Sequence, residues 1–316
     1  MKIILVGYGE MLKALVLGIL NTEHEIVGVF RHDNVLYSPF KKKINDIFRS
    51  SDDFNFIKTL KLPEINAKSA NSDAFIREVK RLKADIIIVG SWSEKFSAQT
   101  INSPKIACIN VHPSLLPKYR GPNPYLQVIL KNESKTGITF HLMDVNYDTG
   151  SILHQAELPI LPNDTGKSLR IRCCNLAKAE VKTLLDNFDN KLKNQQSQKE
   201  TEATYLHNIS LREAILDFKN ETSEQIDRRI RALTPWLNCF IPYKNDFFEF
   251  KNYKILKEIS VKQPATVVKK GKQSIGIVCR DGKVIQFMSL KTKRPFADLL
   301  QRFYFDTIIK ENEQAV

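Results

Sequence analysis

The chain has 316 residues, 42% of them hydrophobic, and a formal net charge of +13, which fits two domains or one large domain around a full apolar core. No apolar run reaches the roughly 18 to 20 residues that span a bilayer, and MKIILVGYGEM at the start is too short for a signal peptide, so we expect no membrane partner. The five scattered cysteines form no CxxC pair, which argues against a disulfide framework or a structural zinc and favours the reducing cytoplasm.

Strand and helix patterns alternate over the first third of the chain. We expect helices at 11–20, 75–82 and 94–101 between apolar strands at 2–7, 25–30, 84–90 and 107–112. This alternation predicts a doubly wound, Rossmann-like α/β sheet, whose ligands bind at the carboxyl ends of its strands. Gly90 and His112 stand at two such ends.

The turn Gly7-Tyr8-Gly9 after the first strand is similar to a dinucleotide-binding fingerprint, but Leu12 takes the place of the third glycine. No convincing acidic residue follows the second strand, because Asp33 falls in a loop. A tight turn from strand to helix explains these glycines better than a nicotinamide site.

The elements after His112 complete one domain and lead to another. We expect a helix at 124–130, strands at 137–144 and 150–160, and a long amphipathic helix at 165–188. The segment 189–205 is strongly polar, which indicates a linker between a first domain at 1–188 and a second domain at 206–316.

The second domain has a different pattern and carries most of the positive charge. We expect helices at 223–232 and 296–305, with short strands at 247–250, 253–259, 265–269, 274–279 and 283–290. Such strands predict a small antiparallel, OB-like β-barrel. The window 251–294 holds 12 Lys or Arg and 2 acids, a balance of +10. A surface that binds a polyanion explains this window at least as well as a generally lysine-rich surface does.

Asn110 and His112 lie two residues apart at the end of the strand 107–112, so their side chains face the same side. Their amide and imidazole groups can both donate hydrogen bonds, as a site for an oxyanion requires. Asp148 lies in a loop between two strands, from which it can orient the imidazole and favour its protonated form.

The alternative for these residues is structural, because a lone Asn-x-His occurs by chance and an isolated histidine is more often part of a core. The remaining histidines are dispersed or lie in separate strands, so we expect no metal site.

The segments INVHPSLLPKYRG and GITFHLMDVNYDTG together resemble the signature of the formyltransferases that use 10-formyltetrahydrofolate. That signature consists of Asn-x-His, Ser-Leu-Leu-Pro-x-x-Arg-Gly and Asp-x-Gly, which stand here at Asn110 and His112, at 114–121, and at Asp148 with Gly150. The resemblance implies that an amine attacks the formyl carbon on N10 of the folate. It further implies that Asn110 and His112 stabilise the oxyanion, while Asp148 holds His112 and assists proton transfer.

The same resemblance implies that 10-formyltetrahydrofolate is a co-substrate and that no metal takes part. The residues that it assigns to folate binding come from the loop after the strand 84–90, the SLLP turn and the loop before Asp148: Gly90, Ser91, Trp92, Ser114, Leu115, Leu116, Pro117, Val145 and Tyr147.

The start of the second domain, ATYLHNISLREAILDF and then IRALTPW, resembles the methionyl-tRNA formyltransferases. This implies an enzyme whose partner is the initiator methionyl-tRNA, held through its phosphates by basic side chains. We expect the enzyme to be a monomer. The candidates for these contacts are Lys41, Lys42, Lys43, Lys269, Lys270, Lys272, Lys291, Lys293 and Arg294. Two alternatives stay open: an enzyme that formylates an amino-sugar nucleotide or another small amine, which Trp92 favours, and a non-catalytic relative that binds folate or nucleic acid.

Overall fold

The computed structural model describes residues 1–31, 52–244, 246–271, 274–292 and 312–315. The chain divides into two compact units, one of residues 1–128, 134–161 and 168–207, the other of residues 129–133, 162–167 and 208–316. Among the described helices, none is long and apolar enough to cross a membrane. The helix that we predicted at 296–305 lies outside the described residues.

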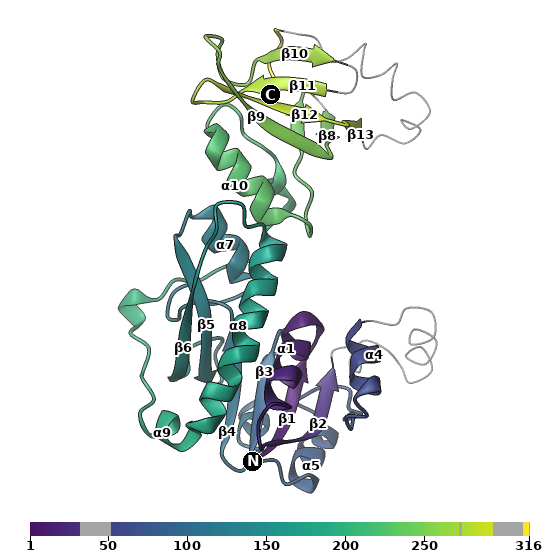
Figure 1. Ribbon diagram of the computed structural model, residues 1–316, viewed down its shortest axis with the longest axis vertical. Helices are drawn as coiled ribbons and strands as arrows, with labels where there is room; N and C mark the ends of the chain where they lie inside the picture. Colours follow the sequence, from purple (N-terminus) through teal and green to yellow (C-terminus); the bar gives the residue numbers. More distant parts are fainter. Residues whose placement is uncertain (32–51, 245, 272–273, 293–311, 316) are drawn as a thin grey trace. The chain divides into compact units, whose positions relative to one another are not determined.

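The first unit is an α/β domain built on one six-stranded sheet of order β2-β1-β3-β4-β5-β6 (Figure 1). Strands β2, β1, β3 and β4 are parallel, β5 is antiparallel to β4, and β6 is antiparallel to β5. The elements are β1 Lys2–Gly7, α1 Gly9–Ile19, β2 Glu25–Arg31, α4 Asp52–Thr59, α5 Asp73–Arg81, β3 Ile86–Gly90, α6 Ala98–Ile101, β4 Ala107–His112, α7 Pro124–Leu130, β5 Lys135–Leu142, β6 Ile152–Pro159, α8 Gly166–Asp186 and α9 Phe188–Lys193. The predicted α/β class is confirmed.

Helices cover both faces of this sheet, which explains why its parallel strands are apolar throughout. Ile4 and Val6 of β1 share one core cluster with Phe75 and Val79 of α5. On the other face, α1 and α8 lie side by side (Figure 1) and pack closely, since a Cβ on Gly18 would stand 2.3 Å from Val181 Cγ1.

The turn after β1 needs glycine because two strands approach each other there. A Cβ on Gly7 would stand 2.1 Å from the carbonyl oxygen of Gly90 at the end of β3. Gly9 has φ +63°, a left-handed conformation that glycine adopts without steric cost. Packing and turn geometry therefore account for both glycines.

The segment 189–205, which we predicted as a linker, belongs to the first compact unit. Its beginning is helical, because α9 follows α8 after a break at Asn187. Further along, Gln196 exchanges two backbone hydrogen bonds with Ile152, and Arg120 pairs with residues 204 to 206. We call residues 196–206 the strap. Several polar side chains of the strap bind other parts of the first unit: Gln198 and Glu200 bind Arg120, and Thr204 binds the Tyr119 N–H.

Over its described residues, the second unit is an antiparallel β domain that also contains the helix α10, and the predicted antiparallel β fold of this domain is confirmed. Its elements are α10 Ser223–Leu233, β7 Ile241–Tyr243, β8 Asp246–Glu249, β9 Asn252–Ile259, β10 Val267–Gly271, β11 Ser274–Val278, β12 Lys283–Met288 and β13 Lys291–Thr292. One sheet has the order β10-β11-β12-β9 and the other β13-β8-β7. Residues of both sheets and of α10 contribute to one core, among them Ile226, Phe248 and Phe287. We did not predict β7 and β13, which have three and two residues and give almost no periodic signal.

Candidate functional site

Strand β4 carries Asn110 and His112 to the carboxyl edge of the first sheet. It lies between β3 and β5, where Gly90 pairs with Val111 and Asn110 is opposite His141. His112 is the last residue of the strand, its side chain is buried, and Pro113 follows it. The alternation of the strand therefore turns both predicted catalytic side chains to one side, at the edge where we expected the site.

Asp148 reaches both of these side chains from the loop between β5 and β6. Its Oδ1 accepts a hydrogen bond from Asn110 Nδ2 at 3.2 Å and lies 3.4 Å from His112 Nδ1. Its Oδ2 accepts the backbone N–H of Gly121 at 2.8 Å. The structure thus brings Asn110, His112 and Asp148 into direct contact and adds Gly121, which closes the SLLPKYRG segment.

A fourth side chain in this cluster, His141, was absent from our predicted site. Its Nε2 lies 3.1 Å from Asn110 Nδ2 and 3.6 Å from Asp148 Oδ1, while its Nδ1 lies 2.8 Å from the carbonyl oxygen of Leu142. A carbonyl accepts only, so Nδ1 carries a hydrogen there. The pairing of β5 with β4 places His141 opposite Asn110, so the register of these two strands is the feature that identifies His141 as part of the cluster.

These contacts determine how Asn110 and His112 are oriented. The Asn110 amide nitrogen donates to Asp148 Oδ1 and lies next to His141 Nε2, so the amide's carbonyl oxygen points away from both. His112 Nε2 lies 2.8 Å from the carbonyl oxygen of Tyr119 and must carry the hydrogen there. In this state, both groups that we expect to donate to an oxyanion are occupied by acceptors of the protein itself.

Burial and neighbouring charges act in opposite directions on the pKa values of this pair. Burial lowers the pKa of His112 below its ordinary value, and the opposing effects of Asp148 and of the Tyr119 carbonyl are smaller. Burial also raises the pKa of Asp148, but His112, His141 and the Gly121 N–H together outweigh it and hold that pKa far below its usual range. Asp148 therefore favours the imidazolium, as we expected, while desolvation of the ring outweighs it.

The residues that we predicted to bind folate fall into two groups. Ser114 and Leu116 are buried and shape the SLLP turn, since Ser114 Oγ donates to the Lys118 carbonyl and Leu116 N–H donates to Thr139 Oγ1. Leu115 packs against Gly137, and the Pro117 carbonyl accepts the Thr204 N–H of the strap.

The second group comes from two loops that contact each other through Tyr147. Tyr147 Oη donates to the carbonyl of Ser93, next to Trp92, at 3.2 Å. Ser91 has φ +59°, Trp92 stacks at a tilt on Phe30, and Val145 and Tyr147 are about half exposed. The loop after Gly90 and the loop before Asp148 therefore contact each other at the carboxyl edge of the sheet.

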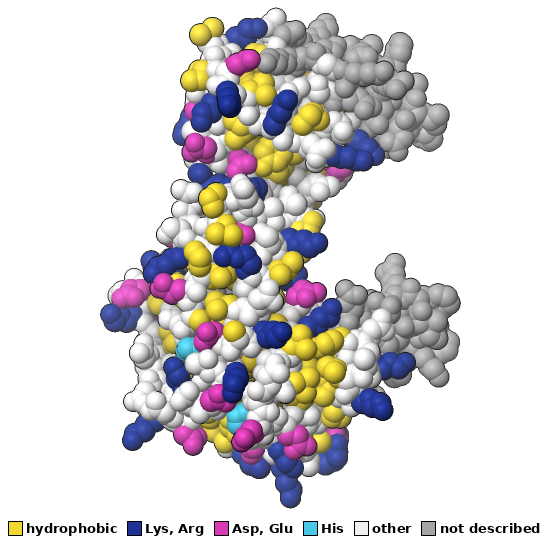
Figure 2. All heavy atoms as spheres, in the orientation of Figure 1, with side chains coloured by type: hydrophobic (Ala, Val, Ile, Leu, Met, Phe, Trp, Pro, Cys, Tyr) yellow, Lys and Arg dark blue, Asp and Glu magenta, His cyan; other side chains and the backbone are white. Residues whose placement is uncertain are grey.

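The structure describes few of the predicted tRNA-binding side chains. Lys291 is exposed on β13, and Lys269 and Lys270 belong to β10. Lys41, Lys42, Lys43, Lys272, Lys293 and Arg294 lie outside the described residues. Figure 2 shows Lys and Arg side chains spread over both units on one face of the molecule, mixed with acidic ones.

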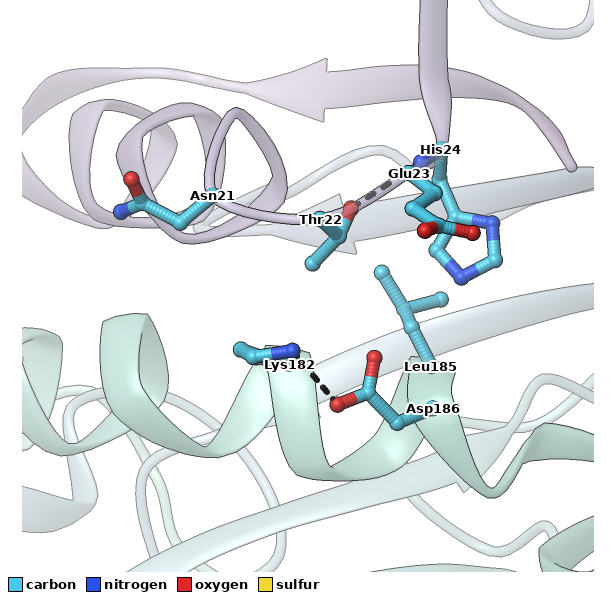
Figure 3. Close-up of a pocket in the computed structure, with 7 residues that line it drawn as sticks. All are labelled: Asn21, Thr22, Glu23, His24, Lys182, Leu185 and Asp186. Atoms are coloured by element: carbon cyan, nitrogen blue, oxygen red, sulfur yellow. Dashed lines mark hydrogen bonds and ion pairs between the residues drawn. The ribbon is translucent and has the colours of Figure 1, made fainter.

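A surface hollow lies at the opposite, amino edge of the first sheet. Its volume is about 580 Å³ and it is lined by residues 21–24 and by Lys182, Leu185 and Asp186 (Figure 3). Lys182 and Asp186 pair with each other at 2.6 Å, and the hollow contains none of the predicted site residues. Among the described residues, no group of three or more His, Cys, Asp or Glu has the arrangement of a metal site.

Comparisons with known proteins identify the family of the chain. Residues 1–186 match the family model described as formyl transferase, and residues 208–298 match the formyl transferase C-terminal domain. The methionyl-tRNA formyltransferase of Francisella philomiragia is 32% identical over 216 residues, which are 68% of each chain.

Two solved structures share the fold at low sequence identity. An N-formyltransferase from Helicobacter canadensis, in complex with folinic acid and dTDP-3-aminofucose, has a TM-score of 0.67 and 20% identity, and the match covers 91% of this chain and 99% of that one. A variant of HypX from Aquifex aeolicus has a TM-score of 0.65 and 17% identity over 98% of this chain, which spans about half (49%) of HypX.

Proposed function

The chain belongs to the formyl transferase family, and we propose that it transfers a formyl group from 10-formyltetrahydrofolate to the amino group of methionyl-tRNA. The observation that carries this proposal is the contact of Asn110, His112 and Asp148 at the carboxyl edge of the sheet. Donors and a carboxylate in one cluster suit acyl transfer, in which negative charge appears on a carbonyl oxygen while a proton leaves the nucleophile.

In the proposed reaction the amine attacks the formyl carbon, and the formyl oxygen becomes an oxyanion. Asn110 and His112 donate hydrogen bonds to that oxygen. Each such donor typically contributes about 3–4 kcal/mol to stabilising the transition state. Asp148 orients His112, stabilises its protonated form, and assists the passage of a proton from the amine to N10 of the folate.

This mechanism requires Asn110 and His112 to exchange hydrogen-bond partners when substrate arrives. The Asn110 amide gives up one of its bonds, to Asp148 or to His141, and His112 Nε2 gives up the Tyr119 carbonyl. The exchange is favourable in the transition state because hydrogen bonds to a charged oxygen are stronger than bonds to a neutral carbonyl. Hydrogen bonds of resting enzymes commonly rearrange in this way in the reacting complex.

Three observations support methionyl-tRNA as the acceptor. The Francisella relative is named for that substrate, and the second unit matches the C-terminal domain of the family. The window 251–294 also carries a charge of +10. On β9, Lys254 and Lys257 are exposed, as is Lys291 on β13. Basic side chains on a domain that follows the catalytic one in the sequence suit a partner with a phosphate backbone.

A screen of formyl acceptors tests the proposal directly. The full chain is incubated with 10-formyltetrahydrofolate and with either methionyl-tRNA or an amino-sugar nucleotide, and formylated product is measured. We expect methionyl-tRNA to give the higher kcat/KM. A higher value for the amino-sugar nucleotide would select the alternative acceptor, and transfer to neither would favour a non-catalytic folate- or nucleic-acid-binding relative.

Charge reversal in the second domain should weaken tRNA binding without affecting the chemistry. We expect the triple variant Lys269→Glu, Lys270→Glu, Lys272→Glu to lower tRNA affinity at low salt for all tRNA sequences alike. The slope of log affinity against log salt should flatten by about 1 for each lost phosphate contact. Filter binding over a salt series measures both quantities.

The matched control reverses three exposed lysines on α8 and α9 of the first unit, Lys178, Lys182 and Lys193. It changes the net charge equally and should leave the salt slope close to that of the wild type. Transfer to a small amine should survive in both variants, because the catalytic side chains are intact. Equal losses of tRNA affinity in the two variants would mean that net charge alone acts, and would argue against a specific basic surface.

A further inference from the structure

The strap connects the two loops that surround His112, although we predicted it as a linker. Gln198 lies at its centre, half-buried, 50 residues from Asp148 and 78 from Arg120 in the sequence. Its Nε2 donates to the carbonyl oxygens of Asp148 at 2.9 Å and Gly150 at 2.8 Å. Its Oε1 accepts from Arg120 Nε at 3.1 Å and from Arg120 Nη2 at 3.0 Å.

These four hydrogen bonds use the full capacity of a primary amide, with two donated and two accepted. They also make the position selective for glutamine. A glutamate would keep the two bonds from Arg120, but it would turn an acceptor oxygen toward the two carbonyl oxygens. The Gln198 side chain therefore joins the buried Arg120 guanidinium to the carbonyl groups of Asp148 and Gly150.

The backbone at Asp148, whose carbonyl accepts from Gln198, has an unfavourable conformation that surrounding contacts must maintain. Asp148 has φ +57°, in the left-handed region that costs a residue with a Cβ roughly 1 kcal/mol or more. The Gly121 N–H holds its carboxylate from one side, and Gln198 holds its main chain from the other. Both contacts determine where Oδ1 lies relative to Asn110 and His112.

The strap also holds the second partner of His112. Thr204 Oγ1 accepts the Tyr119 N–H at 2.7 Å, and the Thr204 carbonyl accepts the Arg120 N–H at 2.9 Å. Tyr119 supplies the carbonyl that His112 Nε2 contacts. Arg120 is itself anchored by Glu200 at 2.8 Å and by the ring of Tyr205 at 5.2 Å. The strap therefore binds both loops that face the His112 ring: the loop with the Asp148 carboxylate at Nδ1 and the segment with the Tyr119 carbonyl at Nε2.

We propose that Gln198 is a positioning residue for formyl transfer, which fixes Asp148 against His112 and Asn110 by binding the backbone of the Asp148 loop and the Arg120 guanidinium. The inference rests on the proposed function of this site. Gln198 acts through Asp148, since its four hydrogen bonds join the main chain of that loop and the Arg120 guanidinium and reach none of the three predicted catalytic side chains.

Gln198→Glu in the full chain tests this role, with Gln198→Ala measured beside it as a variant that adds no charge. We expect kcat to fall roughly 10- to 100-fold in both, because small misplacements of a catalytic group have effects of this size. Folate affinity and the melting temperature should stay near the wild-type values. In an Asp148→Asn background, Gln198→Glu should change the residual kcat less than about 2-fold, because residues that act as one unit are not additive.

The matched control is Gln196→Glu, the same change two residues away in the strap on an exposed side chain. It should leave kcat unchanged. An unchanged kcat in both Gln198 variants, an equal loss in the control, or full additivity with Asp148→Asn would each overturn the inference.

A readout without turnover separates this inference from the proposed function. Amide hydrogen exchange of residues 144–150 should be faster in Gln198→Glu than in the wild type or in Gln196→Glu. If the wild type transferred formyl to no acceptor, the proposed function would fail, and exchange would still decide the role of Gln198. Unchanged exchange in that loop would then reject it.

Discussion

Asp148→Asn should reduce formyl transfer roughly 10³- to 10⁴-fold, the size of loss seen when a buried carboxylate that orients a catalytic histidine becomes an amide. Oδ1 of Asp148 accepts from Asn110 and faces His112, while Oδ2 accepts the Gly121 N–H. An amide has only one acceptor oxygen, so its NH2 group must face a donor on one of these two sides. Single-turnover kinetics with saturating folate measures the loss.

The same variant changes the titration of His112 in a defined direction. Asp148 raises the pKa of His112 against the larger lowering by burial. Removing the carboxylate charge should therefore lower the pKa of His112 further and reduce its imidazolium fraction near neutrality. NMR titration of labelled histidine follows this shift. An unchanged rate together with an unchanged pH profile would exclude Asp148 from the mechanism.

Asp144→Asn is the matched control for the loop. Asp144 lies four residues before Asp148 and accepts hydrogen bonds from Thr149 Oγ1 at 2.7 and 2.8 Å and from the Asn146 N–H at 2.8 Å. The variant makes the same chemical change in the same loop, at a carboxylate whose described hydrogen bonds do not include His112. A loss as large as that of Asp148→Asn would point to the shape of the loop as the cause.

His112→Ala and Asn110→Ala should each reduce transfer about 10²- to 10³-fold, because each removes one donor to the oxyanion. Folate affinity should stay near the wild-type value, since the donors act on charge that appears only in the transition state. Equilibrium folate binding and single-turnover rates separate the two quantities.

The control for these two variants is His24→Ala, which changes a histidine before β2 at the amino edge of the same sheet. We expect it to retain normal transfer. Retention of more than about a tenth of the activity by either site variant would contradict an oxyanion site with two donors, given the loss that one donor normally causes.

The sequence by itself determined the parallel strands of the first sheet, including the strand that carries Asn110 and His112. Apolar runs with turn residues between them predicted β1 to β4 within two residues of their observed ends. The two-residue period of a strand was enough to place Asn110 and His112 on one side, because that period is a property of the local backbone. The signature around Asp148 added the third residue of the site.

Only the tertiary structure decided how these residues are held, because the partners come from distant parts of the chain. His141 joins the site through the pairing of β5 with β4, and Gln198 reaches Asp148 across 50 residues. Composition predicted a linker at 189–205, and polarity alone does not reveal that the buried Arg120 guanidinium binds Gln198 of this segment.

Protonation of His112 was decided by tertiary structure for a related reason. The sequence places a carboxylate in reach of the imidazole, and Asp148 does favour the charged ring. How far burial opposes that effect depends on the packing of the SLLPKYRG segment and β5 around the ring. Desolvation outweighs the nearby charge here because a three-dimensional enclosure, which no sequence pattern specifies, excludes water from the ring.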